Sequence, residues 1–560
     1  MKATRLLFAL FVVAVLGLNL AGCGAPATTA PPTSAPAPAQ PTAAPAQPTA
    51  APPKPTAVPP TATSAPPPTL VMVMNLDDVV TLDPDQAYET TNLMIHNSTY
   101  DTLVEFKAGD LTRVTPRLAD KWEISPDGLN YTFTLHPGVK FASGNPVTAE
   151  DVRFSWTRLK NLKGNPSFYA DVITTVQALD GTTVKVTLTD PSPAFLSIVA
   201  APALSVLDSQ LVKSKGGTDA ADADKTDKAK DWLDQNSAGS GPFIQTSWKP
   251  KAEIVLEANP NYWRGKPKLG KVIIKHMADP TTTLQMLQRG DADLALNTAL
   301  YDLVEQAKAD AKLNVIIGQT LDQNYLAMTS SAALSKPLSD KRVRQAVALS
   351  IDYDGLIKAL LRGYGSRAPS IIPLGVLGVD PKMTQGRDLA KAKALLKDAG
   401  YENGFTVELA YGSNPTRETI AAKIKNDLKE AGITANLKPM EQSVYLTDMR
   451  AQKLAMAFGG WTPDYLDPTM WTDYFSYSDR GIAKRMLYNN PEAEKYAKII
   501  GIELDPAKRE QAIKDLQKVL MDDMAFTMLY QTQQIIVMNK AVKGFAYHPV
   551  NFVSFFDLSN

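Results

Sequence analysis

The sequence of 560 residues contains one cysteine and four histidines. A single cysteine excludes an intramolecular disulfide and a cluster of thiolate ligands. The histidines lie far apart in the chain, so a metal site built from them is not expected either. They are His96, His136, His276 and His548. We therefore expect neither a bound metal nor another cofactor.

An excess of charge of one sign is also missing. Lys and Arg number 58, and Asp and Glu number 58. No basic excess points to nucleic acid as a partner. The common catalytic signatures are absent too, since the chain has no H-E-x-x-H, no G-x-S-x-G, no Walker-type loop and no G-x-G-x-x-G. The composition thus favours a protein that is not an enzyme.

The N-terminus has the features of a secretory signal. Lys2 and Arg5 precede an apolar run from Leu6 to Leu20, which is shorter than the about 20 residues needed to cross a membrane. Residues 20–23 have the sequence L-A-G-C, which resembles the bacterial lipobox. In that motif the cysteine carries lipid and begins the mature chain. We expect residues 1–22 to be a signal peptide and Cys23 to be lipidated.

A low-complexity segment follows, and we assign it to residues 23–69. Positions 25–69 hold 16 of the 41 prolines and a single charge, Lys54. Such a composition cannot bury enough apolar surface to fold, and its prolines favour an extended, solvated backbone. We expect a disordered stalk that tethers a soluble body to the extracytoplasmic face of the cell membrane.

The remaining residues, 70–560, alternate between strand and helix patterns. Residues 405–412 are apolar at every second position, Asn414 and Pro415 have the features of a helix start, and residues 433–439 alternate again. A strand, a helix and a strand within about 35 residues form a βαβ unit with two parallel strands. The body is therefore expected to be mixed α/β.

Other helices are expected to begin behind a polar cap. These caps are Asp279, Ser339, Asp352 and Asp388. Thr148 with Asp151 predicts a capping box, in which each side chain bonds the other residue's backbone. By contrast, the charged stretch at residues 213–231 is interpreted as a solvated surface excursion.

The stretch GWTPDYLDP, residues 460–468, crowds aromatic and acidic side chains together. Pro463 and Pro468 each remove a backbone donor and disfavour helix in the preceding residue. A rigid loop that presents aromatic planes beside Asp464 is expected, and such loops often hold ligands.

Several segments, in this order, resemble the extracellular solute-binding proteins of the peptide and nickel type that serve ABC importers. They include TLDPDQAYETTN from residue 81, ADKWEISPDGLNYTFTLHPGVKF from residue 119, QRGDADLAL from residue 288, PLSDKRVRQAVALSID from residue 337 and the GWTPDYLDP stretch. The resemblance covers nearly all of residues 72–560.

The resemblance implies a two-lobed clamshell of the periplasmic-binding-protein kind (type II), with three structural domains, mixed sheets and a hinge of two chain crossings. The core of lobe 1 would comprise residues 70–105, 239–321 and 536–560, with residues 106–238 inserted as a subdomain. Residues 322–535 would form lobe 2. The crossings would lie near residues 324–331 and 531–539.

It also implies a function. The protein would capture an oligopeptide or dipeptide between its lobes as a monomer and deliver it to the permease of an ABC transporter. In peptide-binding members the aspartate of a W-x-x-D motif pairs with the ligand's α-ammonium, and Trp461 and Asp464 match that motif. Certain members place an arginine six residues earlier, where this chain has Phe458. The expected ligand contacts are Asp464, Trp461, Thr462, Tyr465, Trp471, Tyr88 and Glu89.

Alternatives stay open at this point. Aromatic planes also suit sugar rings, so an oligosaccharide is the second candidate ligand. The family includes binders of nickel chelates, haem and opines, so the fold does not fix the ligand. Asp464 and Asp467 would be the carboxylate pair of a secreted hydrolase. Tyr88 and Glu89 would otherwise cap the helix that follows them.

Overall fold

The computed structural model describes residues 68–296, 298–550 and 553–560. The predictions for the signal segment, for Cys23 and for nearly all of the stalk fall on residues 1–67 and lie outside the described residues. Within the described ranges, no helix combines the length and the apolarity needed to span a bilayer.

The largest sheet in the described residues has eleven strands. Ten of them form a continuous path, and the eleventh pairs with β17 beside that path. In spatial order the path is β15 (Ile433–Met440), β14 (Phe405–Gly412), β16 (Met456–Trp461), β12 (Leu313–Met328), β17 (Phe526–Asn539), β11 (Leu294–Leu296), β1 (Thr69–Met74), β10 (Lys271–His276), β9 (Glu253–Ala258) and β8 (Phe243–Lys249), and the eleventh strand is β13 (Gly365–Ser366).

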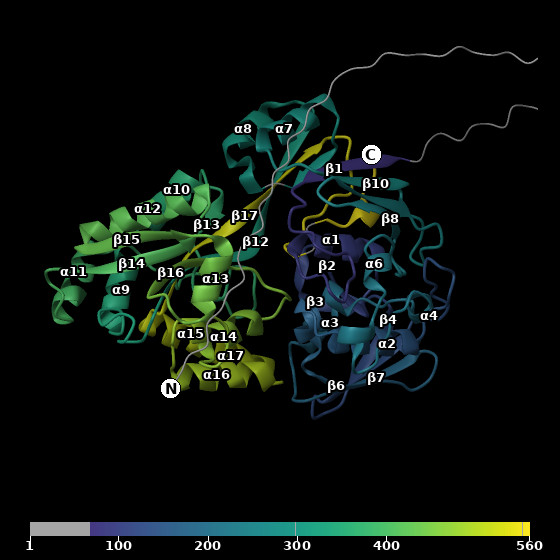
Figure 1. The fold of residues 1–560 in the computed structure, drawn as a ribbon, viewed down its shortest axis with the longest axis horizontal. Helices are drawn as coiled ribbons and strands as arrows, with labels where there is room; N and C mark the ends of the chain where they lie inside the picture. The colour runs from purple at the N-terminus through teal and green to yellow at the C-terminus, as the bar shows by residue number, and fades with distance from the viewer. Residues whose placement is uncertain (1–67, 297, 551–552) are drawn as a thin grey trace, which may run out of the picture. The chain divides into compact units, whose positions relative to one another are not determined.

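The long strands β12 and β17 are the antiparallel pair at the middle of this sheet (Figure 1). The part of β17 that pairs with β11 is limited to residues 536–538, whereas the part of β12 that pairs with β16 is limited to residues 323–328. The two groups of strands are therefore attached to opposite ends of one pair. The register of the pair shifts between Gln319 and Gln323, beside the lobe boundary that we predict at residue 322.

The predicted βαβ unit is present. β14 and β15 are parallel, with Phe405 opposite Ile433, and α12 (Pro415–Glu430) connects them. The side chain of Asn414 accepts a hydrogen bond from the backbone N–H of Arg417 and so caps the helix. Gly432, with a φ of +92°, ends the connection in a conformation that favours glycine.

Three of the four predicted caps are confirmed. Asp279, Asp352 and Asp388 accept backbone hydrogen bonds at the starts of α7 (Pro280–Arg289), α10 (Tyr353–Leu360) and α11 (Leu389–Asp398). The prediction for Ser339 is wrong by one residue. Asp340 caps α9 (Lys341–Ser350) by accepting from the N–H of Arg342 at 2.9 Å, because its carboxylate reaches the first turn.

Two smaller sheets lie within or beside the segment that we assign to the inserted subdomain, residues 106–238. One is the hairpin of β2 (Val104–Lys107) and β3 (Asp110–Pro116), and the other has the order β4 (Ala119–Ile124), β5 (Asn130–Leu135), β7 (Thr183–Leu188) and β6 (Ile173–Ala178). α2 (Ala149–Leu162) covers this segment with a buried stripe that includes Trp156. Its predicted capping box, Thr148 with Asp151, is present.

The interpretation of residues 213–231 as a solvated excursion is wrong at Asp227. The carboxylate of Asp227 accepts from the guanidinium of Arg158 at 2.8 Å, and both side chains are almost fully buried. Arg158 lies on α2, far from Asp227 in the chain. A local charge pattern does not reveal such a long-range pair.

The remaining helices complete the fold. Those that follow residue 322 are α13 (Gln442–Arg450), α14 (Thr469–Ser476), α15 (Gly481–Arg485), α16 (Pro491–Ile502) and α17 (Pro506–Asp523). The others are α1 (Thr90–Thr99), α3 (Phe195–Val199), α4 (Ser209–Ser214), α5 (Ala223–Thr226), α6 (Lys230–Leu233) and α8 (Val304–Ala309), with short 3-10 turns at Asn165–Ala170, Pro202–Leu204, Thr298–Leu303 and Phe555–Asp557.

Candidate ligand-binding site

The loop that carries Asp464 is shorter than predicted. β16 continues to Trp461, which lies opposite Gln323 of β12, so Gly460 and Trp461 are strand residues. The irregular part comprises residues 462–468, between β16 and α14. Gly460 lies opposite Asn324 in the same ladder.

Asp467 anchors the far end of this loop. Its carboxylate accepts from the backbone N–H of Thr469 at 2.9 Å and pairs with Arg509 of α17 at 2.6 Å. Asp467 and Arg509 are both buried. A carboxylate that is bonded in this way holds the loop in position and is not available to a substrate.

Asp464 lies in a different environment. It is partly buried, and among the described residues no cation forms an ion pair with it. Burial raises the pKa of Asp464 to about 6, and a hydrogen bond from the side chain of Tyr88 partly opposes the rise. The hydroxyl of Tyr169 donates to the backbone oxygen of Asp464 at 2.9 Å. Two tyrosines from the first third of the chain thus meet this loop.

A cavity of about 200 Å³ lies beside Asp464. The start of α1 forms one wall and the beginning of the loop forms the other. The lining residues are Tyr88, Glu89, Thr90, Leu93, Tyr169, Thr462, Pro463 and Asp464. Four of the seven predicted ligand contacts, Tyr88, Glu89, Thr462 and Asp464, therefore lie around one cavity.

Tyr88 and Glu89 hold different positions at this cavity. Tyr88 is 39% exposed, and its ring meets the edge of Phe168 with the centroids 6.0 Å apart. Glu89 occupies the N-cap position of α1 without a capping bond from its side chain. Its carboxylate instead accepts from the side chain of Asn92 at 3.0 Å.

The three other predicted contacts, all aromatic, do not line this cavity. Trp461 donates through Nε1 to the backbone oxygen of Met470 at 3.0 Å. The Tyr465 ring faces that of Tyr169, with centroids 6.2 Å apart. Trp471 is 0% exposed and belongs to a hydrophobic core cluster. The prediction of Trp471 as a contact is corrected accordingly, because its place on α14 turns it towards the core.

Sequence reasoning missed Tyr169, Thr90, Leu93 and Pro463 as lining residues. Tyr169 is 295 positions from the loop residue to which it donates, and no local pattern in its surroundings signals the contact. Phe458, which stands where certain family members have an arginine, is 1% exposed in the core. It offers no charge to a ligand.

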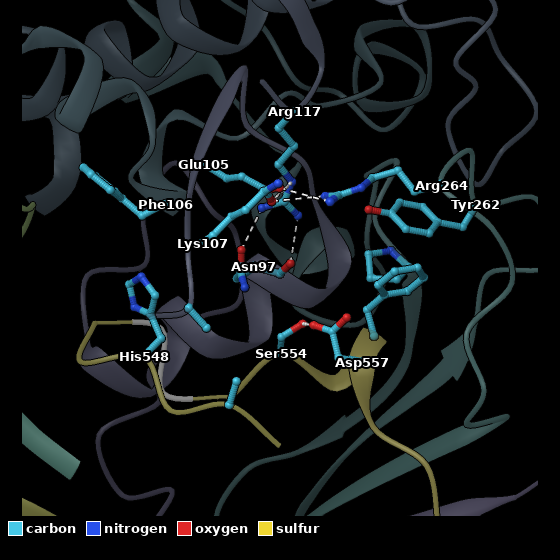
Figure 2. A pocket seen from close by; sticks show the side chains of 14 residues that line it. Asn97, Glu105, Phe106, Lys107, Arg117, Tyr262, Arg264, His548, Ser554 and Asp557 are labelled. Atoms are coloured by element: carbon cyan, nitrogen blue, oxygen red, sulfur yellow. Dashed lines mark hydrogen bonds and ion pairs between the residues drawn. The ribbon is translucent and has the colours of Figure 1, made fainter. Parts of the chain in front are cut away.

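A second cavity, of about 340 Å³, is shown in Figure 2. Its arginines are satisfied within the protein. Arg117 donates to the side chain of Asn97 at 2.7 Å and pairs with Asp101 at 2.7 Å, while Arg264 pairs with Glu105 at 3.0 Å. Since both guanidinium groups already have partners, these two arginines are less suited than Asp464 to bind a charged group of a ligand.

No group of three or more His, Cys, Asp and Glu side chains in the described ranges is arranged to hold a metal ion.

Comparison with known proteins identifies the family. The profile of the bacterial extracellular solute-binding proteins, family 5 (middle part), matches residues 113–482. The chain belongs to this family. It is 31% identical over 487 residues to the probable D,D-dipeptide-binding periplasmic protein DdpA of Escherichia coli strain K12, covering 86% of this chain and 92% of that protein. The resemblance seen in the sequence is thereby confirmed.

Two further relatives show how widely this family varies. Heme-binding protein A of Haemophilus influenzae is 28% identical over 489 residues, 82% of this chain and 86% of its own length. The periplasmic binding protein DppA of Helicobacter pylori, solved with the peptide STSA, superposes with a TM-score of 0.72 at 27% identity over 88% of this chain and 97% of its own. The predicted two-lobed α/β fold with mixed sheets is confirmed by this likeness.

Proposed function

We propose that this family 5 solute-binding protein captures a dipeptide or short oligopeptide in a cleft between its lobes and delivers it to the permease of an ABC transporter. The observation that carries the proposal is the Asp464 carboxylate, which is partly buried beside a cavity and has no ion-pair partner among the described residues. A peptide supplies the missing cation through its free α-ammonium.

The chemistry suits a transporter of mixed peptides. Every peptide with a free N-terminus carries the same ammonium, whatever its side chains are, so one carboxylate recognises the class without selecting a sequence. Backbone hydrogen bonds to the extended ligand add affinity in the same sequence-independent way. The relatives named for dipeptide and peptide ligands support this assignment.

Closure of the lobes follows from the placement of the contacts. Tyr88 and Tyr169 belong to segments that we assign to lobe 1, and Asp464 belongs to the segment that we assign to lobe 2. A ligand that touches both sets of residues stabilises the closed state, because only that state offers all the contacts. β12 and β17, which connect the two segments, are the proposed hinge.

The alternatives are weaker. A stacking platform for an oligosaccharide loses Trp471, which is buried in the core. A hydrolase would use Asp464 with Asp467, but Arg509 already holds Asp467. Absence of turnover when the protein is incubated with peptides or cello-oligosaccharides, together with stoichiometric binding, excludes the hydrolase.

Native mass spectrometry of the purified protein tests the proposal, since closure slows the escape of a natural ligand. After denaturation, we expect the released material to be short peptides of mixed sequence. Masses separated by hexose units would reassign the cleft to an oligosaccharide. Released haem would place this protein with its haem-binding relative.

Peptide affinity should decrease in acid. Because burial raises the pKa of Asp464 to about 6, the carboxylate of the free protein is ionised above this pH and neutral below it. Affinity for alanyl-alanine is expected to be greatest near pH 7, where the carboxylate is ionised and the peptide's ammonium is still protonated, and to fall by about tenfold per pH unit below pH 6. Calorimetric titrations between pH 4.5 and 7.5 measure this. An affinity that stays constant through pH 4.5, or the same pH profile in Asp464→Asn, contradicts the assignment.

We further propose that the protein is a lipoprotein anchored through Cys23 on the extracytoplasmic face, with residues 23–69 as a spacer. Stable anchoring takes two or more acyl chains, as a bacterial lipoprotein carries. Cys23→Ser is expected to move the protein from the membrane fraction to the soluble fraction, as followed by immunoblotting of fractionated cells. Continued membrane association of Cys23→Ser contradicts the lipid anchor.

A further inference from the structure

Leu504 lies at a contact between two segments that we assign to different lobes. It belongs to the connection between α16 and α17 in lobe 2 and is 43% exposed. A Cβ built on Gly128, in the β4–β5 turn of the inserted subdomain, would lie 2.8 Å from Cδ1 of Leu504 and 3.4 Å from Cβ of Pro191. Leu504 therefore rests against the surface that Gly128 and Pro191 form.

Gly128 suits this contact in two ways. Its φ of +69° is a conformation that favours glycine, and the absence of a side chain leaves room for Leu504. Gly128 is also buried, although Pro126 and Asp127 in the same turn are exposed. Because the tip of a hairpin is normally open to solvent, the burial of this glycine indicates that Leu504 covers it.

Tyr465 provides a second contact between the same two segments. It packs against the core cluster that contains Trp471 of lobe 2 and also against the core cluster that contains Trp156 of the inserted subdomain. Its ring lies beside that of Tyr169, whose hydroxyl donates to the backbone oxygen of Asp464. The inserted subdomain thus meets lobe 2 at the loop of Asp464 as well as at Leu504.

The surfaces around these contacts are mostly apolar. A cavity of about 420 Å³ lies between them, and its lining includes Trp122 and Leu196 of the inserted subdomain and Val376 and Leu466 of lobe 2. Among the described residues, no ion pair joins the inserted subdomain to lobe 2. The attraction between the two segments therefore depends on apolar surface removed from water, and salt does not screen it.

We propose that the contact of Leu504 with the β4–β5 turn is a latch between the lobes, which stabilises the closed state and slows the escape of a bound peptide. This inference rests on the proposed peptide-binding function. It adds a positioning residue that acts away from the ligand, since Leu504 does not line the cavity at Asp464. The latch forms only when the lobes are closed, so it favours closure whatever the sequence of the peptide.

The test compares the wild type with Leu504→Asp and with Leu179→Asp as the matched control. Leu179 is 56% exposed in the β6–β7 turn of the inserted subdomain, and each leucine directly precedes an aspartate, Asp180 or Asp505. Because β5 is antiparallel to both β4 and β7, the β6–β7 turn lies at the opposite end of this sheet from Gly128. Circular dichroism establishes that each variant is folded.

Calorimetry measures the affinity for alanyl-alanine, and stopped-flow tryptophan fluorescence measures the rate constants. We expect Leu504→Asp to bind about five- to tenfold more weakly, through faster dissociation at an unchanged association rate, because a partly buried leucine contact is lost from the closed state alone. Leu179→Asp should behave as the wild type does. A partial loss of folded protein would lower the bound fraction without changing the dissociation rate. If Leu504→Asp does not fold, the dissociation rate of Leu504→Ala decides.

Two results overturn the latch and leave the proposed function intact. One is a dissociation rate in Leu504→Asp equal to that of the wild type. The other is equal weakening in Leu504→Asp and Leu179→Asp, because the added negative charge and not the contact would then be responsible. Failure of the wild type to bind alanyl-alanine, with release of a ligand that is not a peptide on denaturation, overturns both proposals.

Discussion

Replacing Asp464 with alanine is expected to weaken the binding of a short peptide by about 2 to 5 kcal/mol, the usual effect of truncating one partner of a charge pair in a desolvated site. No described cation pairs with this carboxylate, so the variant frees no protein charge and its loss of affinity reports on the ligand's ammonium. Calorimetric titration of wild type and Asp464→Ala with alanyl-alanine measures the difference.

Asp479→Ala is the matched control, because Asp479 is exposed between α14 and α15 and pairs only with the adjacent Arg480 among the described residues. It should bind as the wild type does. N-acetylation of the peptide removes the ammonium and should weaken binding to the wild type about as much as the substitution does. Equal affinity of the wild type for free and N-acetylated peptides contradicts the role of Asp464.

The two aspartates of this loop show why sequence alone does not separate a binding residue from a structural one. Asp464 and Asp467 are three residues apart, and either suits a turn or a ligand contact. Their difference comes from Arg509, which is 42 positions from Asp467 and pairs with it in the fold. Only the tertiary structure shows that Asp467 has a cation as its partner, whereas Asp464 forms no ion pair with a described residue.

Local structure was predictable because it depends on neighbours in the chain. The parallel pair β14 and β15, the cap at Asn414 and the capping box at Thr148 all follow from residue types within one or two turns. Even the error at Ser339 concerns one position, since Asp340 competes for the same role and its carboxylate is the acceptor that reaches the helix.

Long-range burial was not predictable in the same way. Asp227 stands in a charged stretch that is typical of solvent, yet its side chain is 2% exposed because Arg158 binds it. Trp471 stands among aromatics that suit a ligand, yet it faces the core. Arg158 decides the burial of Asp227, and the core cluster decides that of Trp471. Both depend on residues that are distant in the chain, so neither periodicity nor composition predicts the burial.

Arg158→Met is expected to lower the free energy of unfolding by about 3 to 5 kcal/mol, because it leaves buried carboxylates without their cation. Arg158 is 0% exposed and donates to Asp83, Asp85 and Asp227 at 2.7 to 2.9 Å. Burial raises the pKa of Asp85 to about 7 even with Arg158 opposing the rise. Urea denaturation followed by tryptophan fluorescence measures the loss.

Arg153→Met is the matched control on the same helix. Arg153 pairs with Glu150 at 2.6 Å and with Asp219 at 2.8 Å near the surface, and each such pair contributes about 0 to 1 kcal/mol. Equal stability of the two variants would contradict a structural role for the buried cluster.

The cluster of Arg158 with its three aspartates also affects ligand binding, because Asp85 precedes Tyr88 by three residues. Since Arg158 holds this segment against α2, Arg158→Met should also weaken the binding of alanyl-alanine, whereas Arg153→Met should not.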